Sequence, residues 1–281
     1  MPTTTRSGVE ICYDTFGSDD GEPLVLINGL GSQMIRWPEG FIDLLIERGF
    51  RVIVHDNRDV GLSQKFADAT ESPAYSVNDM AADTVGVLEH LGIDSAHVAG
   101  MSMGGMITQV IAIRHPERVR SIASIMSATG DDAVLSTDNE AVKIFAEPPE
   151  TEREKAIEQD VRHRRIISGP GFPFDEDAAR DLATRCYDRC YDPSGRRRQM
   201  IAVTASPGRK AALSKLTVPA VVIHGTHDPL VPVENGRRTA EAIPGAELVE
   251  IEGMGHDLPA GAWATVADAI AANARRAAPV A

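Results

Sequence analysis

The sequence predicts an α/β fold, a mostly parallel, twisted sheet flanked by helices, because two kinds of segment alternate along the chain. Short apolar runs such as residues 24–27 are typical of strands that are buried on both faces. Segments with helical spacing follow them, and the helix expected at residues 103–115 is apolar on nearly every side. The alternation stops over residues 129–215, which predicts a helical cap inserted before the last two strands.

The first half of the chain is expected to hold a hairpin and four strands. Residues 3–15 alternate polar and apolar side chains around Ser7-Gly8, as the strands of a hairpin do. A helix should begin at Ser76 and stop at Gly92. The remaining elements expected here are strands at residues 24–27, 51–54, 96–99 and 119–126, and helices at residues 37–48 and 103–115.

Charged helical stretches, at residues 151–165 and 175–189, are expected within the cap. We interpret two arginine clusters in this region as solvated helix faces, with anion binding as the alternative. The clusters are Arg162, Arg164 and Arg165, and Arg196, Arg197 and Arg198.

The alternation of strands and helices resumes after the cap. Strands are expected at residues 218–223 and 246–251, and helices at Val233–Ala242 and residues 263–275. The core domain is therefore predicted to comprise residues 1–128 and 216–281, and the cap residues 129–215.

Composition and charge argue against several classes of protein. The net charge is −13, and so acidic a surface disfavours nucleic acids and anionic membranes as partners. The N-terminal residues lack the apolar run of a signal peptide, and no stretch approaches the roughly 20 apolar residues of a membrane span. Three cysteines are too few, and odd in number, for a disulfide framework. We therefore expect a cytoplasmic protein and leave its oligomeric state open, a homo-oligomer included.

The stretch with the most chemical information is Gly100-Met101-Ser102-Met103-Gly104, which joins a buried strand to a buried helix. In this context Gly-x-Ser-x-Gly predicts a nucleophile elbow, a strained turn that lifts the serine hydroxyl out of the sheet edge. A glycine-rich turn with an incidental serine is the alternative, so the interpretation depends on the partners of Ser102.

Two further polar residues, Asp228 and His256, follow later strands. Because ligands bind at the carboxyl ends of parallel strands, these residues and Ser102 should meet in one region. His256 can take the hydroxyl proton near neutral pH, and the Asp228 carboxylate can orient the imidazole. The three residues predict a catalytic triad, and their chain order of Ser, Asp and His is that of α/β-hydrolases.

Neighbouring residues offer two alternatives to this triad. Asp257 is a rival carboxylate, although side chains adjacent in sequence normally diverge. His224 and His227 precede Asp228 in a pattern that loosely resembles a metal site, but two histidines three apart at a strand end should face different directions. We therefore expect no metal and no other cofactor.

An acyl-transfer enzyme also needs N–H donors for the negatively charged oxygen of its intermediate. The backbone N–H of Met103, directly after the nucleophile, should be one donor. The other should be Leu30, whose neighbours Gly29 and Gly31 allow the backbone to approach the substrate.

The substrate pocket is expected to be apolar because methionines flank the predicted site, and methionine adapts to irregular ligands. At least half of the flanking residues should fill the core instead. The residues predicted to line the pocket are Met34, Trp37, Met126 and Met254.

Several segments of the chain resemble the α/β-hydrolase fold superfamily. They are residues 28–31, 56–63, 100–104, 227–229 and 253–256. Within the superfamily the chain is most similar to the aclacinomycin methylesterase group, through His55-Asp56-Asn57-Arg58-Asp59 and residues 166–175. This resemblance implies the triad and the N–H donors named above, and a lid over the substrate.

One departure from the family pattern is Asn28-Gly29, where many relatives carry His-Gly. The asparagine can still hydrogen-bond within the oxyanion loop, so the fold should be unaffected. We interpret residues 56–63 as structural, with Asp56 and Arg58 bracing that loop.

The sequence thus predicts a serine hydrolase that cleaves a carboxylic ester of a small, apolar molecule, a methyl ester among the candidates. Alternatives with the same triad are hydrolysis of a carbon–carbon bond, a lactone or an amide, because the fold does not set the substrate. Alternatives from other classes are a non-catalytic binding protein of this fold and a metallohydrolase.

Overall fold

The computed structural model describes residues 1–69, 72–131, 140–144 and 147–277. Its strands are β1 (Thr3–Thr4), β2 (Ile11–Phe16), β3 (Glu22–Ile27), β4 (Phe50–His55), β5 (Ala96–Met101), β6 (Val119–Ile125), β7 (Ala220–Gly225) and β8 (Glu247–Ile251). They form one eight-stranded sheet in the order β1-β2-β4-β3-β5-β6-β7-β8. The β1–β2 and β2–β4 pairs are antiparallel, and all other neighbouring strands are parallel.

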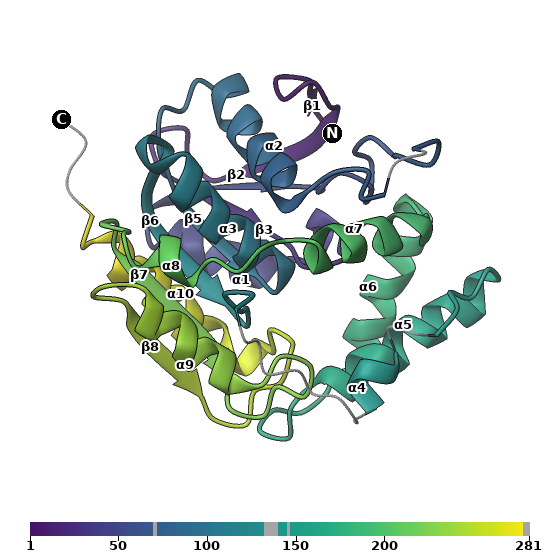
Figure 1. The fold of residues 1–281 in the computed structure, drawn as a ribbon. Helices are drawn as coiled ribbons and strands as arrows, with labels where there is room; N and C mark the ends of the chain where they lie inside the picture. Colours follow the sequence, from purple (N-terminus) through teal and green to yellow (C-terminus); the bar gives the residue numbers. More distant parts are fainter. Residues whose placement is uncertain (70–71, 132–139, 145–146, 278–281) are drawn as a thin grey trace.

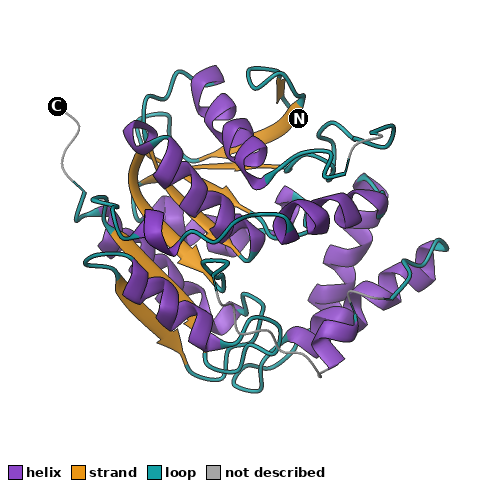
Figure 2. Ribbon diagram, in the orientation of Figure 1, coloured by secondary structure: helices purple, strands orange, loops and turns teal. Residues whose placement is uncertain are grey.

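Helices cover both faces of this sheet (Figures 1 and 2). One face is covered by α2 (Val77–His90), α3 (Met103–Arg114) and α9 (Val233–Ala242), and the other by α1 (Glu39–Glu47) and α10 (Trp263–Ala274). The predicted fold, a mostly parallel sheet flanked by helices, is confirmed.

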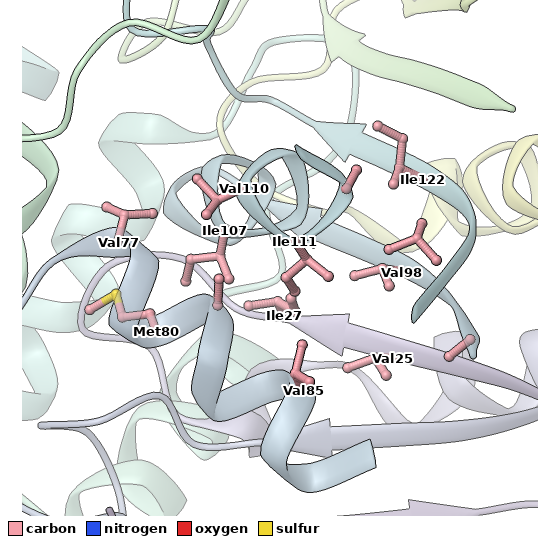
Figure 3. Close-up of a cluster of buried hydrophobic side chains, with 14 of the residues drawn as sticks. Val25, Ile27, Val77, Met80, Val85, Val98, Ile107, Val110, Ile111 and Ile122 are labelled. Atoms are coloured by element: carbon pink, nitrogen blue, oxygen red, sulfur yellow. The ribbon is translucent and has the colours of Figure 1, made fainter. Parts of the chain in front are cut away.

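A cluster of buried apolar side chains beneath α2 and α3 holds the central strands and these helices together (Figure 3). Side chains from β3, β5 and β6 point toward both helices. Figure 3 labels Val25, Ile27, Val98 and Ile122 from the strands, Ile107, Val110 and Ile111 from α3, and Val77, Met80 and Val85 from α2. Burying one such side chain contributes about 1.5–3 kcal/mol, so this contact anchors the strand and the helix on either side of Ser102.

Prolines shift two of the predicted boundaries. The helix expected at residues 37–48 begins at Glu39, because Pro38 has the extended ψ of 136° and acts as its N-cap. A 3₁₀ turn, Met34–Arg36, precedes it. β7 begins at Ala220, because Pro219 has no N–H for the strand ladder.

Between β6 and β7 the described residues form further helices. They are α4 (Glu140–Lys143), α5 (Arg153–Ile167), α6 (Glu176–Arg189), α7 (Ser194–Thr204) and α8 (Lys210–Leu213). α4, α5 and α6 lie outside the two helical layers of the sheet (Figure 1), and α5 packs on α6 through a small apolar cluster of its own. α7 was not predicted, since Pro193 precedes it and acts as its N-cap where the sequence suggested a break. Within the predicted cap, residues 132–139 and 145–146 lie outside the described residues.

None of the helices in the described ranges has the length and hydrophobicity needed to span a membrane.

Replacing Gly104 by alanine should destabilise the fold strongly. A Cβ atom at this position would lie 2.1 Å from the Ile27 carbonyl oxygen, which is backbone and cannot move aside. We expect the free energy of unfolding in urea to fall by at least about 3 kcal/mol, the upper range for overpacking. Gly92→Ala is the control: it meets nothing within 4 Å and should cost only about 1–2 kcal/mol for its φ of 69°. Equal losses in both variants would contradict the steric explanation.

Candidate active site

Ser102 lies at the turn between β5 and α3. Its φ of 56° and ψ of −120° form a backbone conformation that non-glycine residues rarely adopt, at a cost of about 1–3 kcal/mol. Two hydrogen bonds hold this strained conformation: Ser102 N–H donates to Ile125 O at 2.9 Å, and the Ser127 hydroxyl Oγ donates to Ser102 O at 2.8 Å. The strained turn predicted for this serine is therefore present.

The loop after β3 approaches Ser102 closely. A Cβ atom on Gly29 would lie 3.2 Å from Ser102 Cβ and 3.7 Å from its Oγ, so the backbone of Gly29 contacts the serine. The N–H groups of Leu30 and Met103 donate no hydrogen bond to any described residue. Met103 is the first residue of α3, where an N–H has no acceptor within the helix. Two N–H donors thus flank Ser102 with their hydrogen-bonding capacity unused by the described chain.

His256 and Asp228 form a buried, hydrogen-bonded pair beyond the ends of β8 and β7. His256 Nδ1 donates to Asp228 Oδ2 at 2.7 Å, which leaves Nε2 of the imidazole as a proton acceptor. Asp228 Oδ1 accepts from the N–H groups of Leu230 at 2.9 Å and Val231 at 2.7 Å. Burial alone would raise the pKa of Asp228, but the neighbouring His256 and His224 imidazoles hold it well below its usual range. The carboxylate therefore stays ionised beside His256.

Ser102 and His256 line the same cavity, whose volume is about 270 Å³. Leu30 and Ile167 also line it, so the cavity lies between the loop after β3 and the end of α5. In the described chain no hydrogen bond joins Ser102 to His256. Such contacts commonly tighten only in the complex with substrate.

Comparison with known proteins identifies the family. Residues 22–259 match the family described as alpha/beta hydrolase fold, which is well over half of the chain. This chain belongs to the α/β-hydrolase family.

The relatives of this α/β-hydrolase indicate which class of enzyme it belongs to within the family. It is similar to rhodomycin D methylesterase DnrP of Streptomyces peucetius, with 32% identity over 99% of both chains. It is 31% identical to rhodomycin D methylesterase DauP of Streptomyces sp. strain C5, again over 99% of both chains. An enol-lactonase structure from Burkholderia xenovorans LB400 shares the fold, with a TM-score of 0.71 and 24% identity over 98% of both chains. The predicted likeness to methylesterases and the predicted class, a carboxylic-ester hydrolase, are confirmed.

Asp56 holds the loop after β3 in this α/β-hydrolase. Its Oδ1 accepts from Met34 N–H at 2.7 Å, and its Oδ2 is 2.7 Å from Arg189 of α6. Asp56 therefore braces the loop as predicted. Arg58 differs from the prediction, because its guanidinium pairs with Asp83 of α2 at 2.7 Å and stabilises that helix instead.

Asn28, which stands where many relatives carry histidine, takes part in the hydrogen bonds that hold the loop after β3. Asn28 Nδ2 donates to Gln33 O at 2.9 Å, and Asn57 Nδ2 donates to Asn28 O at 3.1 Å. The asparagine hydrogen-bonds within the loop as expected, so its own side chain helps to position Gly29 against Ser102.

The predicted pocket residues divide between the cavity and the core. Met126 lines the cavity, although it is only 1% exposed and belongs to the same apolar cluster as the other three residues. Met34, Trp37 and Met254 are at most 2% exposed and belong to the apolar cluster that α1 and α10 form with the sheet. These three are corrected to core residues, because the sheet face covered by α1 and α10 takes up their side chains.

The cavity is more charged than predicted, because α5 and α7 each turn one arginine toward it. Arg164 and Arg196 line the cavity, so their interpretation as solvated residues is wrong. Arg162 and Arg165 are exposed, as predicted. A signal for the difference was available: Asp160 precedes Arg164 by four residues, which places both on one face of α5.

The two histidines before Asp228 face different directions, as predicted. His224 is fully buried, with Nε2 2.7 Å from Val231 O and 3.5 Å from Asp228 Oδ2. His227 is exposed, with Nδ1 3.0 Å from Thr226 Oγ1. Where the structure describes the chain, no three His, Cys, Asp or Glu side chains are grouped so as to hold a metal ion.

Asp257, the rival carboxylate, lines the cavity beside His256, and its Oδ1 is buried without a hydrogen-bond partner in the described chain. Burial raises the pKa of Asp257 to about 6. The folded state therefore holds this proton more tightly than the unfolded state, so the residue lowers stability as the pH rises from about 4 to 6.

Asp257→Asn should remove this pH dependence. Between pH 5 and pH 8, the stability of the variant relative to wild type should increase by about 1.4 kcal/mol, one pKa unit of linkage. Urea unfolding at both pH values measures the difference. A constant offset between variant and wild type across this range would show that Asp257 titrates normally.

Proposed function

We propose that this α/β-hydrolase cleaves carboxylic esters through an acyl-enzyme, with Ser102 as nucleophile, His256 as general base and acid, and Asp228 orienting His256. The observation that carries the proposal is the strained Ser102 turn, which shares a cavity with a His256 imidazole that is hydrogen-bonded to the buried Asp228 carboxylate. The strained turn exposes the Ser102 hydroxyl, His256 can remove its proton, and the Asp228 carboxylate orients the imidazole.

In the proposed reaction, Ser102 Oγ attacks the ester carbonyl carbon while His256 Nε2 takes the hydroxyl proton. The carbonyl oxygen becomes negatively charged and accepts hydrogen bonds from the N–H groups of Leu30 and Met103. Collapse of this intermediate breaks the bond to the alcohol oxygen, which leaves with the proton from His256. A water molecule, deprotonated by His256, then attacks the acyl-enzyme carbonyl. The bond from that carbon to Ser102 Oγ breaks, His256 returns the proton to Oγ, and the acid is released.

The proposal includes a small-molecule methyl ester as the substrate, since two relatives that match over the whole chain are methylesterases. We further propose that residues 129–215 act as a cap over the reacting ester. The contact between His256 N–H and Ile167 O at 2.8 Å supports this role, because it joins the end of α5 directly to the loop that carries the imidazole.

A fluorophosphonate probe and a substrate panel test the proposal. The probe should label the peptide that contains Ser102, and the enzyme should release methanol from methyl esters. The panel also contains a lactone, an amide and a β-diketone at equal concentration. Faster turnover of any of these three would move the assignment to that bond, and failure of the probe to label Ser102 would favour a non-catalytic binding protein.

A further inference from the structure

We propose that the substrate ester carries a carboxylate as well, and that Arg164 binds this carboxylate in the cavity beside Ser102. The inference rests on the proposed function and adds the chemical class of its substrate.

Arg164 stands on α5 and lines the cavity together with Ser102 and His256. Its side chain is 31% exposed, and burial together with the nearby Arg36 guanidinium lowers its pKa to about 10. Arg164 therefore remains a cation at neutral pH although most of its surface is removed from water. A cation in such a place is costly unless an anion faces it.

The nearest carboxylate to Arg164 is already engaged elsewhere. Asp160 Oδ1 accepts from Arg36 at 2.7 Å, whereas Asp160 Oδ2 is 3.8 Å from Arg164 Nε, too far for a hydrogen bond. In the described chain the Arg164 guanidinium donates no hydrogen bond at all. Two guanidinium groups thus share one carboxylate, and the donors of Arg164 are unused.

The charges around the cavity favour a single added anion. Of the described residues that line it, Arg36, Arg164 and Arg196 oppose the carboxylates of Asp160 and Asp257. Arg36 and Arg164 already present two positive charges to the one carboxylate of Asp160, so a substrate monocarboxylate would balance the second charge and a phosphate dianion would exceed it. The planar guanidinium also matches a carboxylate through two parallel hydrogen bonds.

Matched esters test this inference. Monomethyl esters of the dicarboxylic acids from succinic to suberic acid carry one carboxylate at increasing distance from the ester. The kcat/KM of each monomethyl ester is compared with that of the uncharged dimethyl ester of the same acid. The value for the dimethyl ester is halved, because that molecule offers two ester groups. For wild type, kcat/KM should favour the best monomethyl ester by at least about tenfold. Arg164→Gln should lower this preference by about 10- to 100-fold, as expected for losing hydrogen bonds to a charged group.

Arg165→Gln is the matched control, because Arg165 is an exposed arginine of the same helix that pairs with Glu176. It should retain the preference of wild type, and Arg164→Lys should retain part of it. Because each preference is a ratio measured on one preparation, partial unfolding of a variant does not affect it.

Two results would overturn the inference: no preference for the charged esters in wild type, or an unchanged preference in Arg164→Gln. Both are distinct from failure of the proposed function, in which Ser102→Ala would hydrolyse charged and uncharged esters as fast as wild type.

Discussion

Replacing Ser102 by alanine should lower kcat on p-nitrophenyl butyrate by about 10⁴- to 10⁶-fold, the loss typical of removing a triad nucleophile. Alanine has no oxygen to form the acyl-enzyme, while the N–H groups of Leu30 and Met103 remain to polarise the ester for direct attack by water. Release of p-nitrophenol under saturating substrate measures the effect. The variant should also fail to react with the fluorophosphonate probe.

Ser214→Ala is a suitable control for this experiment, since Ser214 is an exposed serine whose Oγ donates only to Ala211 O at 3.1 Å. It should retain wild-type kcat. A Ser102→Ala enzyme within tenfold of wild type would remove Ser102 from the reaction and with it the proposed acyl-enzyme.

Replacing Asp228 by asparagine should lower kcat by about 10³- to 10⁴-fold with little change in KM. The asparagine amide can donate a hydrogen bond to His256 Nδ1, which would place the imidazole proton on Nε2 and prevent that nitrogen from accepting the Ser102 proton. The 2.7 Å bond from His256 Nδ1 to Asp228 Oδ2 is the contact that enforces the productive tautomer.

Asp257→Asn is the matched comparison for Asp228→Asn, because both carboxylates neighbour His256 and the change in each is isosteric. We expect it to lower kcat by less than tenfold, since no hydrogen bond joins Asp257 to the imidazole in the described chain. A larger loss in Asp257→Asn than in Asp228→Asn would reverse the roles assigned to the two carboxylates.

Local sequence patterns were sufficient to predict most of the strands and helices of the fold. The apolar run at residues 24–27 lies within β3, the strand expected at residues 96–99 lies within β5, and the helix expected from Ser76 is α2, with Ser76 as its N-cap. These signals are informative because burial on both faces of a sheet favours apolar residues at most positions of a strand. The helix that begins at Ser194 was missed because Pro193 and Gly195 are ambiguous: proline can end a helix or precede one.

The charged lining of the cavity was less accessible to prediction. Arg164 and Arg165 are neighbours in sequence, yet one lines the cavity and the other is exposed. Composition does not predict which of the two arginines lines the cavity, because the direction of each side chain depends on how α5 packs against α6 and against the loop that carries His256. Met34, Met126 and Met254 all belong to one buried apolar cluster, and the same packing explains why only Met126 also lines the cavity.

The sequence by itself determined the α/β architecture and the positions of Ser102, Asp228 and His256 after three strands, because strand patterning and the elbow motif are local properties of the chain. The tertiary structure alone decided that His256 pairs with Asp228 at 2.7 Å and that Arg36 and Arg164 share the carboxylate of Asp160. These contacts join segments far apart in the chain, and whether a charged side chain meets a partner, a cavity or water depends on which of those segments pack together.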